Sequence, residues 1–126
     1  MKRLPALSAF LFLLVVPLAY AAESVTPPVE LADAPIIAVD WSRGASQMVT
    51  LHGNRTLSFS NGQKGGKYLL ILKQDAIGSR TVTWPSSVHW PGANGPTLSS
   101  TANTTDYISF FHNGVSYDMV AVSQGF

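Results

Sequence analysis

One stretch near the middle of the chain decides the fold: KYLLILKQD (67–75), the turn GSR (78–80) and TVTWPSSVHWP (81–91). Residues 68–72 form an unbroken apolar run, which is too short for a helix and fits a strand that is covered on both faces. In the segment that follows, Val82 and Trp84 share one face because side chains alternate along a strand. These two segments predict neighbouring strands at the centre of an all-β domain.

The same alternation recurs on both sides of this stretch. In residues 55–60, Leu57 and Phe59 point to one face, and in residues 105–111, Ile108 and Phe110 do so, with Tyr107 and Phe111 on the other. Alternating apolar positions are typical of strands with one face in the core, so we expect the first four side chains to be buried. Further strands are predicted at residues 36–41, 47–51 and 115–122.

The dipeptide Asn113-Gly114 between two predicted strands is the strongest hairpin signal in the chain, because both residues tolerate the positive φ of a tight turn. No segment after residue 21 keeps a helical period long enough to predict a helix. Seven or eight short strands separated by turns therefore predict an antiparallel β-sandwich with a jelly-roll-like arrangement.

The N-terminal segment is predicted to be an export signal. Residues 1–3 are basic, residues 4–18 are almost wholly apolar, and residues 19–21 supply the small side chains that signal peptidase recognises. We therefore expect residues 1–21 to form a signal helix that is cleaved after Ala21. The alternative is an uncleaved membrane anchor, although the apolar run is shorter than the roughly 20 residues that a membrane span requires.

Residues 22–35 contain three prolines and little periodicity, so they are predicted to form an extended arm ahead of a β-sandwich domain over residues 36–126. The arm is either a disordered leader or an assembly arm that packs on a neighbouring subunit through Val25, Val29 and Leu31. An extended arm of this kind is a ready donor strand for an exposed sheet edge.

Charge and composition exclude several functions. Removal of Lys2 and Arg3 leaves six basic residues against seven acidic ones without a basic stripe, so nucleic acid is not an expected partner. The absence of cysteine excludes disulfides and a lipid-anchored export route. Contact with a membrane is expected only if the N-terminal signal is retained.

The sequence contains no catalytic or metal-binding pattern. The candidate ligands, acids and bases are His52, His89, His112, Asp40, Asp75, Asp106 and Asp118. The histidines lie in or beside turns without the spacing of metal ligands. The aspartates fall on different strands or turns, so nothing singles out the carboxylate pair of a glycoside hydrolase. We therefore expect no enzyme activity, no metal and no cofactor.

One aromatic segment is a candidate binding surface. Trp84 and Trp90 each precede a proline, and His89 lies beside the second tryptophan. Aromatic faces bind the apolar faces of sugar rings, so Trp84, His89 and Trp90 together could bind a cell-surface glycan. The alternative is that the two tryptophans belong to the core, since each such ring buries roughly 150–250 Å².

A string of motifs runs through most of the chain after residue 39: NRTLSFSN (54–61), YLLILKQD (68–75), GSRTVTWP (78–85), VHWPG (88–92), PTL (96–98) and DYISFF (106–111). Together these motifs resemble a small β domain that recurs in bacteriophage tail-fibre and other virion appendage proteins. The resemblance extends over residues 39–126. It implies an architectural role and supplies no catalytic residues.

We therefore expect a non-enzymatic structural subunit of a virion appendage or extracellular assembly. It would be exported and would associate with copies of itself, as a trimer or a filament, through sheet edges or a trimeric interface. The alternative is a carbohydrate- or receptor-binding module that uses the region around Trp84 and Trp90.

Overall fold

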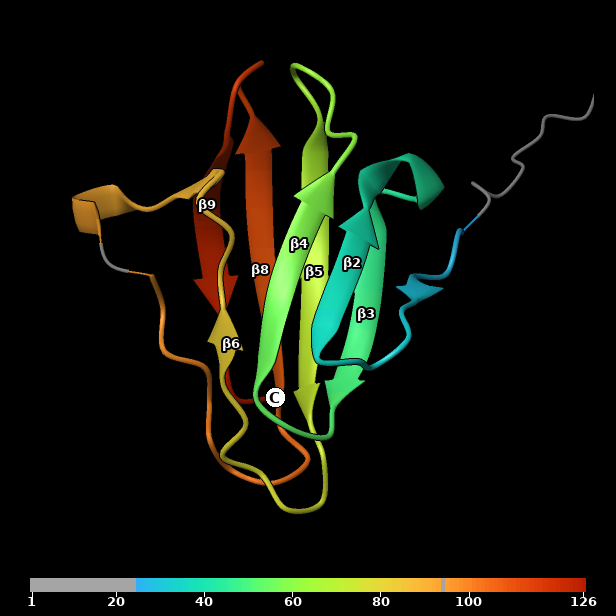
Figure 1. Ribbon diagram of the computed structural model, residues 1–126, viewed down its shortest axis with the longest axis vertical. Coiled ribbons are helices and arrows are strands. Elements are labelled where there is room, and N and C mark those ends of the chain that lie inside the picture. Colours follow the sequence, from blue (N-terminus) through green and yellow to red (C-terminus); the bar gives the residue numbers. More distant parts are fainter. Residues whose placement is uncertain (1–24, 94) are drawn as a thin grey trace, which may run out of the picture.

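The computed structural model describes residues 25–93 and 95–126. The predicted signal segment, residues 1–21, lies outside them. The described chain consists of strands joined by loops and two short 3₁₀ turns (Figure 1), which confirms the all-β prediction. None of its helical segments is long and apolar enough to cross a membrane.

The strands form two sheets that face each other (Figure 1). The six-stranded sheet has the spatial order β1 (Val29–Glu30), β3 (Ser46–Leu51), β5 (Lys67–Gln74), β8 (Thr105–His112), β9 (Tyr117–Ser123) and β7 (Val88–His89). The three-stranded sheet has the order β2 (Ile36–Asp40), β4 (Arg55–Ser60) and β6 (Val82–Thr83). The 3₁₀ turns are η1 (Trp41–Arg43) and η2 (Pro91–Ala93).

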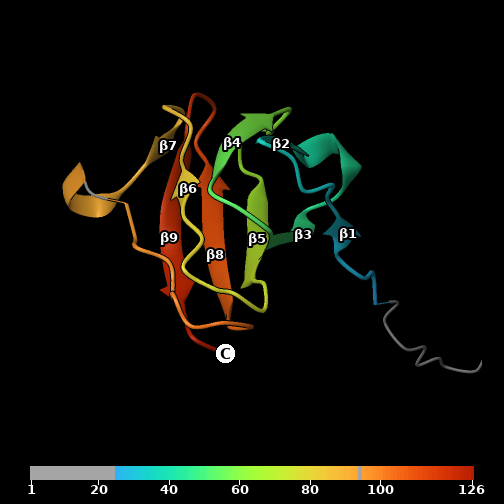
Figure 2. The same cartoon turned by 60° about the horizontal axis from the view of Figure 1, so that its bottom comes forward.

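From β1 to β7 the chain passes to the other sheet with every new strand (Figures 1 and 2). Two such passages restore the original direction, so β1 pairs with β3, β2 with β4, β3 with β5 and β4 with β6, all in parallel. The intervening strand in the facing sheet acts as the crossover that a parallel pair requires. Antiparallel pairing joins β5 to β8 and β8 to β9.

The predicted antiparallel, jelly-roll-like pairing is therefore wrong for most of the strand pairs. Apolar alternation indicates which face of a strand is buried and carries no information about the direction of its neighbour. The turns at residues 42–44, 52–54 and 61–66 have the composition of hairpin loops, but each leads the chain to the facing sheet.

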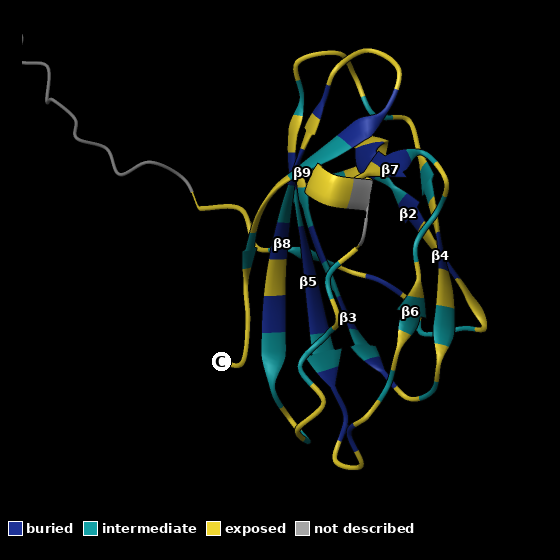
Figure 3. Ribbon diagram, turned by 90° about the vertical axis from the view of Figure 1, so that its left-hand side faces the viewer, coloured by how far each residue is buried: buried dark blue, intermediate teal, exposed yellow. Residues whose placement is uncertain are grey.

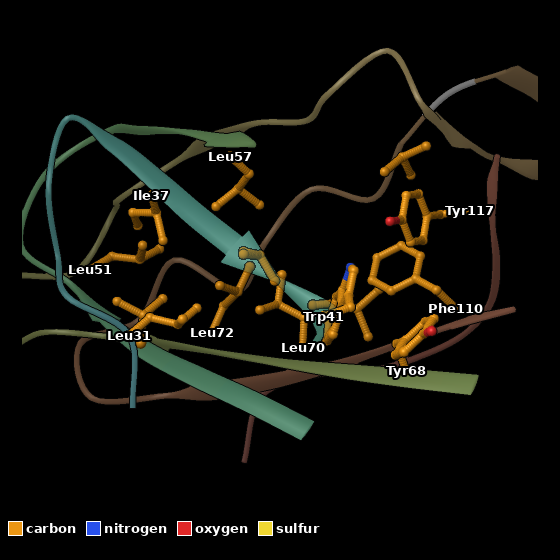
Figure 4. Packing of buried hydrophobic residues seen from close by; sticks show 14 residues of the cluster. Leu31, Ile37, Trp41, Leu51, Leu57, Tyr68, Leu70, Leu72, Phe110 and Tyr117 are labelled. Atoms are coloured by element: carbon orange, nitrogen blue, oxygen red, sulfur yellow. The ribbon is translucent and has the colours of Figure 1, made fainter. Parts of the chain in front are cut away.

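The core lies between the two sheets (Figure 4). Of the four side chains predicted to be buried, Leu57, Ile108 and Phe110 are at most 2% exposed, and Phe59 is half-buried against the core. At one end of the core, Trp41 stacks on Tyr68 with ring centroids 4.7 Å apart. Burial of each such apolar side chain contributes about 1.5–3 kcal/mol, so these contacts between the sheets are a main source of stability.

The hairpin predicted at Asn113-Gly114 is confirmed. Asn113 Oδ1 accepts hydrogen bonds from the backbone N–H groups of Val115 and Ser116, and Gly114 has a φ of 103°. Glycine adopts this φ without the steric cost that a side chain imposes. The turn sets the pairing of β8 with β9 and so completes the centre of the six-stranded sheet.

Part of the predicted arm is built into the fold. β1 pairs with β3 of the same chain, and the backbone N–H of Leu31 donates to the carbonyl of Met48 at 2.8 Å. Leu31 is 8% exposed and belongs to the core, Val29 is half-buried, and Val25 is 89% exposed. The burial of Val29 and Leu31 therefore needs no neighbouring subunit, and contact of the arm with another subunit stays a prediction.

Candidate interaction surfaces

The two tryptophans that the sequence singles out lie together. Trp84 follows β6 and Trp90 follows β7, and their rings meet edge to face with centroids 4.9 Å apart. Both rings also pack near Phe110 of β8, at centroid distances of 6.0 and 6.3 Å. Each tryptophan is half-buried and packs against the core. The pair therefore supports the domain and also presents part of its aromatic surface.

His89 does not join this pair. Alternation along β7 places Val88 in the core and His89 on the outer side of the six-stranded sheet, level with Asp118 of β9. His89 Nδ1 lies 3.3 Å from Ser116 Oγ and 3.9 Å from Asp118 Oδ1. The predicted binding set is thus divided, with both indole rings against the core and the imidazole on the opposite side of the sheet.

Ser116, His89 and Asp118 have the residue types of a catalytic triad without its geometry. In a triad the serine and the carboxylate contact different ring nitrogens of the histidine. Here both contacts converge on Nδ1. Asn113 Nδ2 donates to Ser116 Oγ and to Asp118 Oδ2, both at 3.0 Å. We therefore interpret this cluster as support for the turn between β8 and β9.

Asp75 fixes the loop after β5. Its carboxylate accepts hydrogen bonds from the backbone N–H groups of Ile77 and Gly78 and from Nε and Nη2 of Arg80. The Arg80 guanidinium, together with these backbone donors, holds the pKa of Asp75 well below its usual range. A carboxylate stabilised in its charged form in this way is suited to holding a loop and not to accepting a proton near neutral pH.

Asp106 and Asp40 also bind backbone turns. Asp106, which is 2% exposed, accepts hydrogen bonds from the backbone N–H groups of Ser99 at 2.7 Å and Gly125 at 3.0 Å. Asp40 caps η1 by accepting from the backbone N–H of Ser42 at 3.0 Å. Among the described residues, no group of three or more His, Cys, Asp or Glu side chains is arranged to hold a metal ion.

A pocket of about 290 Å³ lies between residues 79–82, which lead into β6, and residues 96–100. Its lining includes polar residues, among them Ser79, Arg80, Thr81 and Thr97, and the apolar residues Val82 and Leu98. The sequence does not reveal this pocket, because the two segments are separated along the chain and neither carries a ligand-binding motif. Its volume is near the lower limit of small-molecule sites.

The outer side of the six-stranded sheet carries an apolar surface. We call the side chains of Met48, Leu69, Ile71, Tyr107 and Phe111, which point away from the three-stranded sheet, the outer apolar face. Tyr107 and Phe111 are each 37% exposed, as expected from their predicted orientation away from the core. In Figure 3 this side of the sheet looks to the left, away from β2, β4 and β6.

A protein-family model described as "Putative phage tail fibre C-terminal domain" matches residues 36–117. The match begins at the first residue of β2 and ends at the first residue of β9, so it includes the tryptophan pair and the whole outer apolar face. No curated protein and no solved structure matches the chain significantly.

Proposed function

The chain belongs to the phage tail fibre C-terminal domain family, and we propose on this premise that it is a non-enzymatic structural subunit of a virion appendage. The observation that carries the proposal is the extent of the family match, which spans most of both sheets. The carboxylates support it, because Asp40, Asp75 and Asp106 are bound to backbone turns of the domain itself. Membership of this family implies that the protein is associated with the virion and is extracellular.

We further propose that copies of the chain associate, through sheet edges or a trimeric interface. Three edge strands of the described sheets, β1, β6 and β7, are two residues long, and short edges offer little template for a further strand. β2 is an edge strand of five residues in regular pairing with β4. It is the better acceptor for an extended segment, such as the exposed part of a neighbour's arm around Val25.

Immunogold labelling of purified virions tests the structural role. We expect an antibody against the chain to label the tail appendages, and we expect virions made after deletion of the gene to lack both the label and the appendage. The intact mass of the virion-borne protein also tests the proposed export, because cleavage after Ala21 would remove residues 1–21. Complete, infective virions that contain none of this chain would contradict the proposal.

Glycan binding at the tryptophan pair is the second candidate function. It is favoured by the edge-to-face contact of Trp84 with Trp90, which leaves part of both rings exposed. On a glycan array, Trp90→Ala should abolish binding, whereas His89→Ala should retain it because the imidazole lies on the other side of the sheet. Circular dichroism would verify that both variants are folded. Absence of binding by the wild type would exclude this candidate.

A further inference from the structure

We propose that the outer apolar face binds the same face of a second copy of this chain, about a two-fold axis that runs along β8. The inference rests on the proposed function, because it names the surface through which the structural subunit associates. It differs from association through sheet edges, since here two sheets pack face to face.

Over residues 68–72, β5 is apolar on both of its sides. Alternate side chains of this strand enter the core, whereas Leu69 and Ile71 point outward. Such a strand is typical of a sheet that is covered on both faces. Within the described chain, the outer side receives the ring of Phe126, which meets Tyr107 edge to face at 5.5 Å, but no further layer (Figure 3). A partner on this side would cover Tyr107 and Phe111, which are each 37% exposed.

The pairing register arranges the outer apolar face in rows across the strands. Met48, Ile71 and Tyr107 are direct neighbours across β3, β5 and β8. Ile71 is 6% exposed, so this row is already closely packed. Phe111 lies four residues beyond Tyr107 on the same side of β8. The centre of the face is therefore uncharged, with aromatic side chains along β8.

Charges of both signs lie at one end of the face. Lys67 of β5, Phe111 of β8 and Asp118 of β9 form a single row, so the lysine and the aspartate flank β8 about 10 Å apart. A two-fold axis above β8 and parallel to it exchanges the positions of β5 and β9. It therefore places Lys67 of each copy opposite Asp118 of the other. The row of Lys67 and Asp118 is therefore its own electrostatic complement, which is the argument for a second copy as the partner.

The same axis places β8 on β8, so Tyr107 and Phe111 each meet the same residue of the other copy along the middle strand of the interface, with Phe111 in the row of Lys67 and Asp118. Central aromatic side chains typically dominate the energy of binding. Three overlapping strands, β5, β8 and β9, that are about 4.8 Å apart and about 23 Å long give a flat area of roughly 350 Å² per copy. This is less than half of the roughly 800 Å² of a standard interface. We therefore expect a weak dimer with a dissociation constant in the micromolar range.

Analytical ultracentrifugation of the purified protein over about 1–500 µM, a range that brackets micromolar affinity, measures this association. Phe111→Lys should raise the dissociation constant at least about tenfold, because the two-fold axis brings the two introduced lysine side chains against each other. Val115→Lys is the matched control, since Val115 is 87% exposed in the turn between β8 and β9 and does not belong to the face. It should change the constant by less than about twofold.

Charge reversal tests the two-fold arrangement itself. Lys67→Glu and Asp118→Lys should each weaken the dimer about fivefold, because each variant places like charges opposite one another twice. The double variant restores both pairs with exchanged signs and should return the dissociation constant to within about twofold of the wild type. Arg43→Glu, at an exposed position in η1 after β2 of the three-stranded sheet, is the control and should have little effect.

The outcomes separate this inference from the proposed function. If the wild type associates but Phe111→Lys and the charge reversals do not weaken this association, the outer apolar face is not the interface. The proposed structural role would be unaffected by that result. A trimer would overturn the two-fold axis in the same way. A wild type that stays monomeric throughout the concentration range would overturn self-association altogether, while the labelling of virions would still decide the structural role.

Discussion

Asp75 shapes two loops at once. Its hydrogen bonds to the backbone N–H groups of Ile77 and Gly78 close the turn after β5. Gly78 has a φ of 79°, and a Cβ atom at this position would lie 2.6 Å from the carbonyl oxygen of Ser100. A larger residue would therefore both strain the turn and separate it from the segment before β8. The carboxylate and the glycine together allow these two loops to pack closely.

The ionisation of Asp75 should make the stability of the domain depend on pH. Because Arg80 and the backbone donors stabilise the carboxylate, its pKa in the folded state lies below the value of about 3.9 in the unfolded chain. The contribution of Asp75 to stability is therefore complete above the unfolded pKa, declines as the pH falls below it, and is lost once the pH passes below the folded pKa.

Urea titrations between about pH 2.5 and 7, which span the unfolded pKa, measure this effect. The wild type should lose unfolding free energy with falling pH more steeply than Asp75→Asn, so the two proteins should differ least at the lowest pH. Arg80→Met removes the main cause of the lowered pKa and should also flatten the profile. Parallel profiles for all three proteins would show that Asp75 is not held in its charged form.

β1 should contribute to the stability of the domain although it has only two residues. Leu31, which directly follows it, is 8% exposed, so Leu31→Ala should lower the free energy of unfolding by about 2–3 kcal/mol. Val25→Ala, in the same arm at 89% exposure, should change it by less than about 0.5 kcal/mol. Urea unfolding followed by tryptophan fluorescence measures both. Equal effects of the two substitutions would mean that the arm is not docked on β3.

Alternation along the chain is sufficient to locate strands but not to pair them. The predicted strand at residues 55–60 is identical with β4, because Leu57 and Phe59 must face the core whichever strand lies beside them. The parallel direction of β2 and β6 on either side of β4 depends on where each turn leads, and turn composition does not encode it.

The candidate interaction surfaces were also predicted only in part from the sequence. The Trp-Pro motifs predict an aromatic pair, and the structure brings Trp84 and Trp90 together. The separation of His89 from this pair was not predicted, because no strand is predicted from the sequence at residues 88–89, where alternation turns His89 away from the core. The apolar run at residues 68–72 predicts cover on both sides of β5, whereas the partner for its outer side cannot be read from the run itself.

At the scale of the whole molecule, the path of the chain joins the two sheets into one unit. Parallel pairs connect residues about 20 positions apart, such as Ile36 with Thr56 and Ser46 with Leu69, and the residues between them lie in the other sheet. The three-stranded sheet therefore cannot assemble without ordering β3 and β5, and the six-stranded sheet cannot assemble without ordering β4. Neither sheet is expected to persist when the other unfolds.

Unfolding in urea should consequently be a single transition. Far-UV circular dichroism reports the strands of both sheets, and a Trp84→Phe/Trp90→Phe variant leaves Trp41, which stacks on Tyr68 in the core, as the one fluorescent tryptophan. The two signals should give the same midpoint, and refolding should take milliseconds to seconds because the strand pairs are distant in sequence. A difference of more than about 0.3 M urea between the two midpoints would exceed the uncertainty of such fits. It would mean that part of the sheet structure persists after the core around Trp41 has opened. The two sheets would then not fold together, contrary to this prediction.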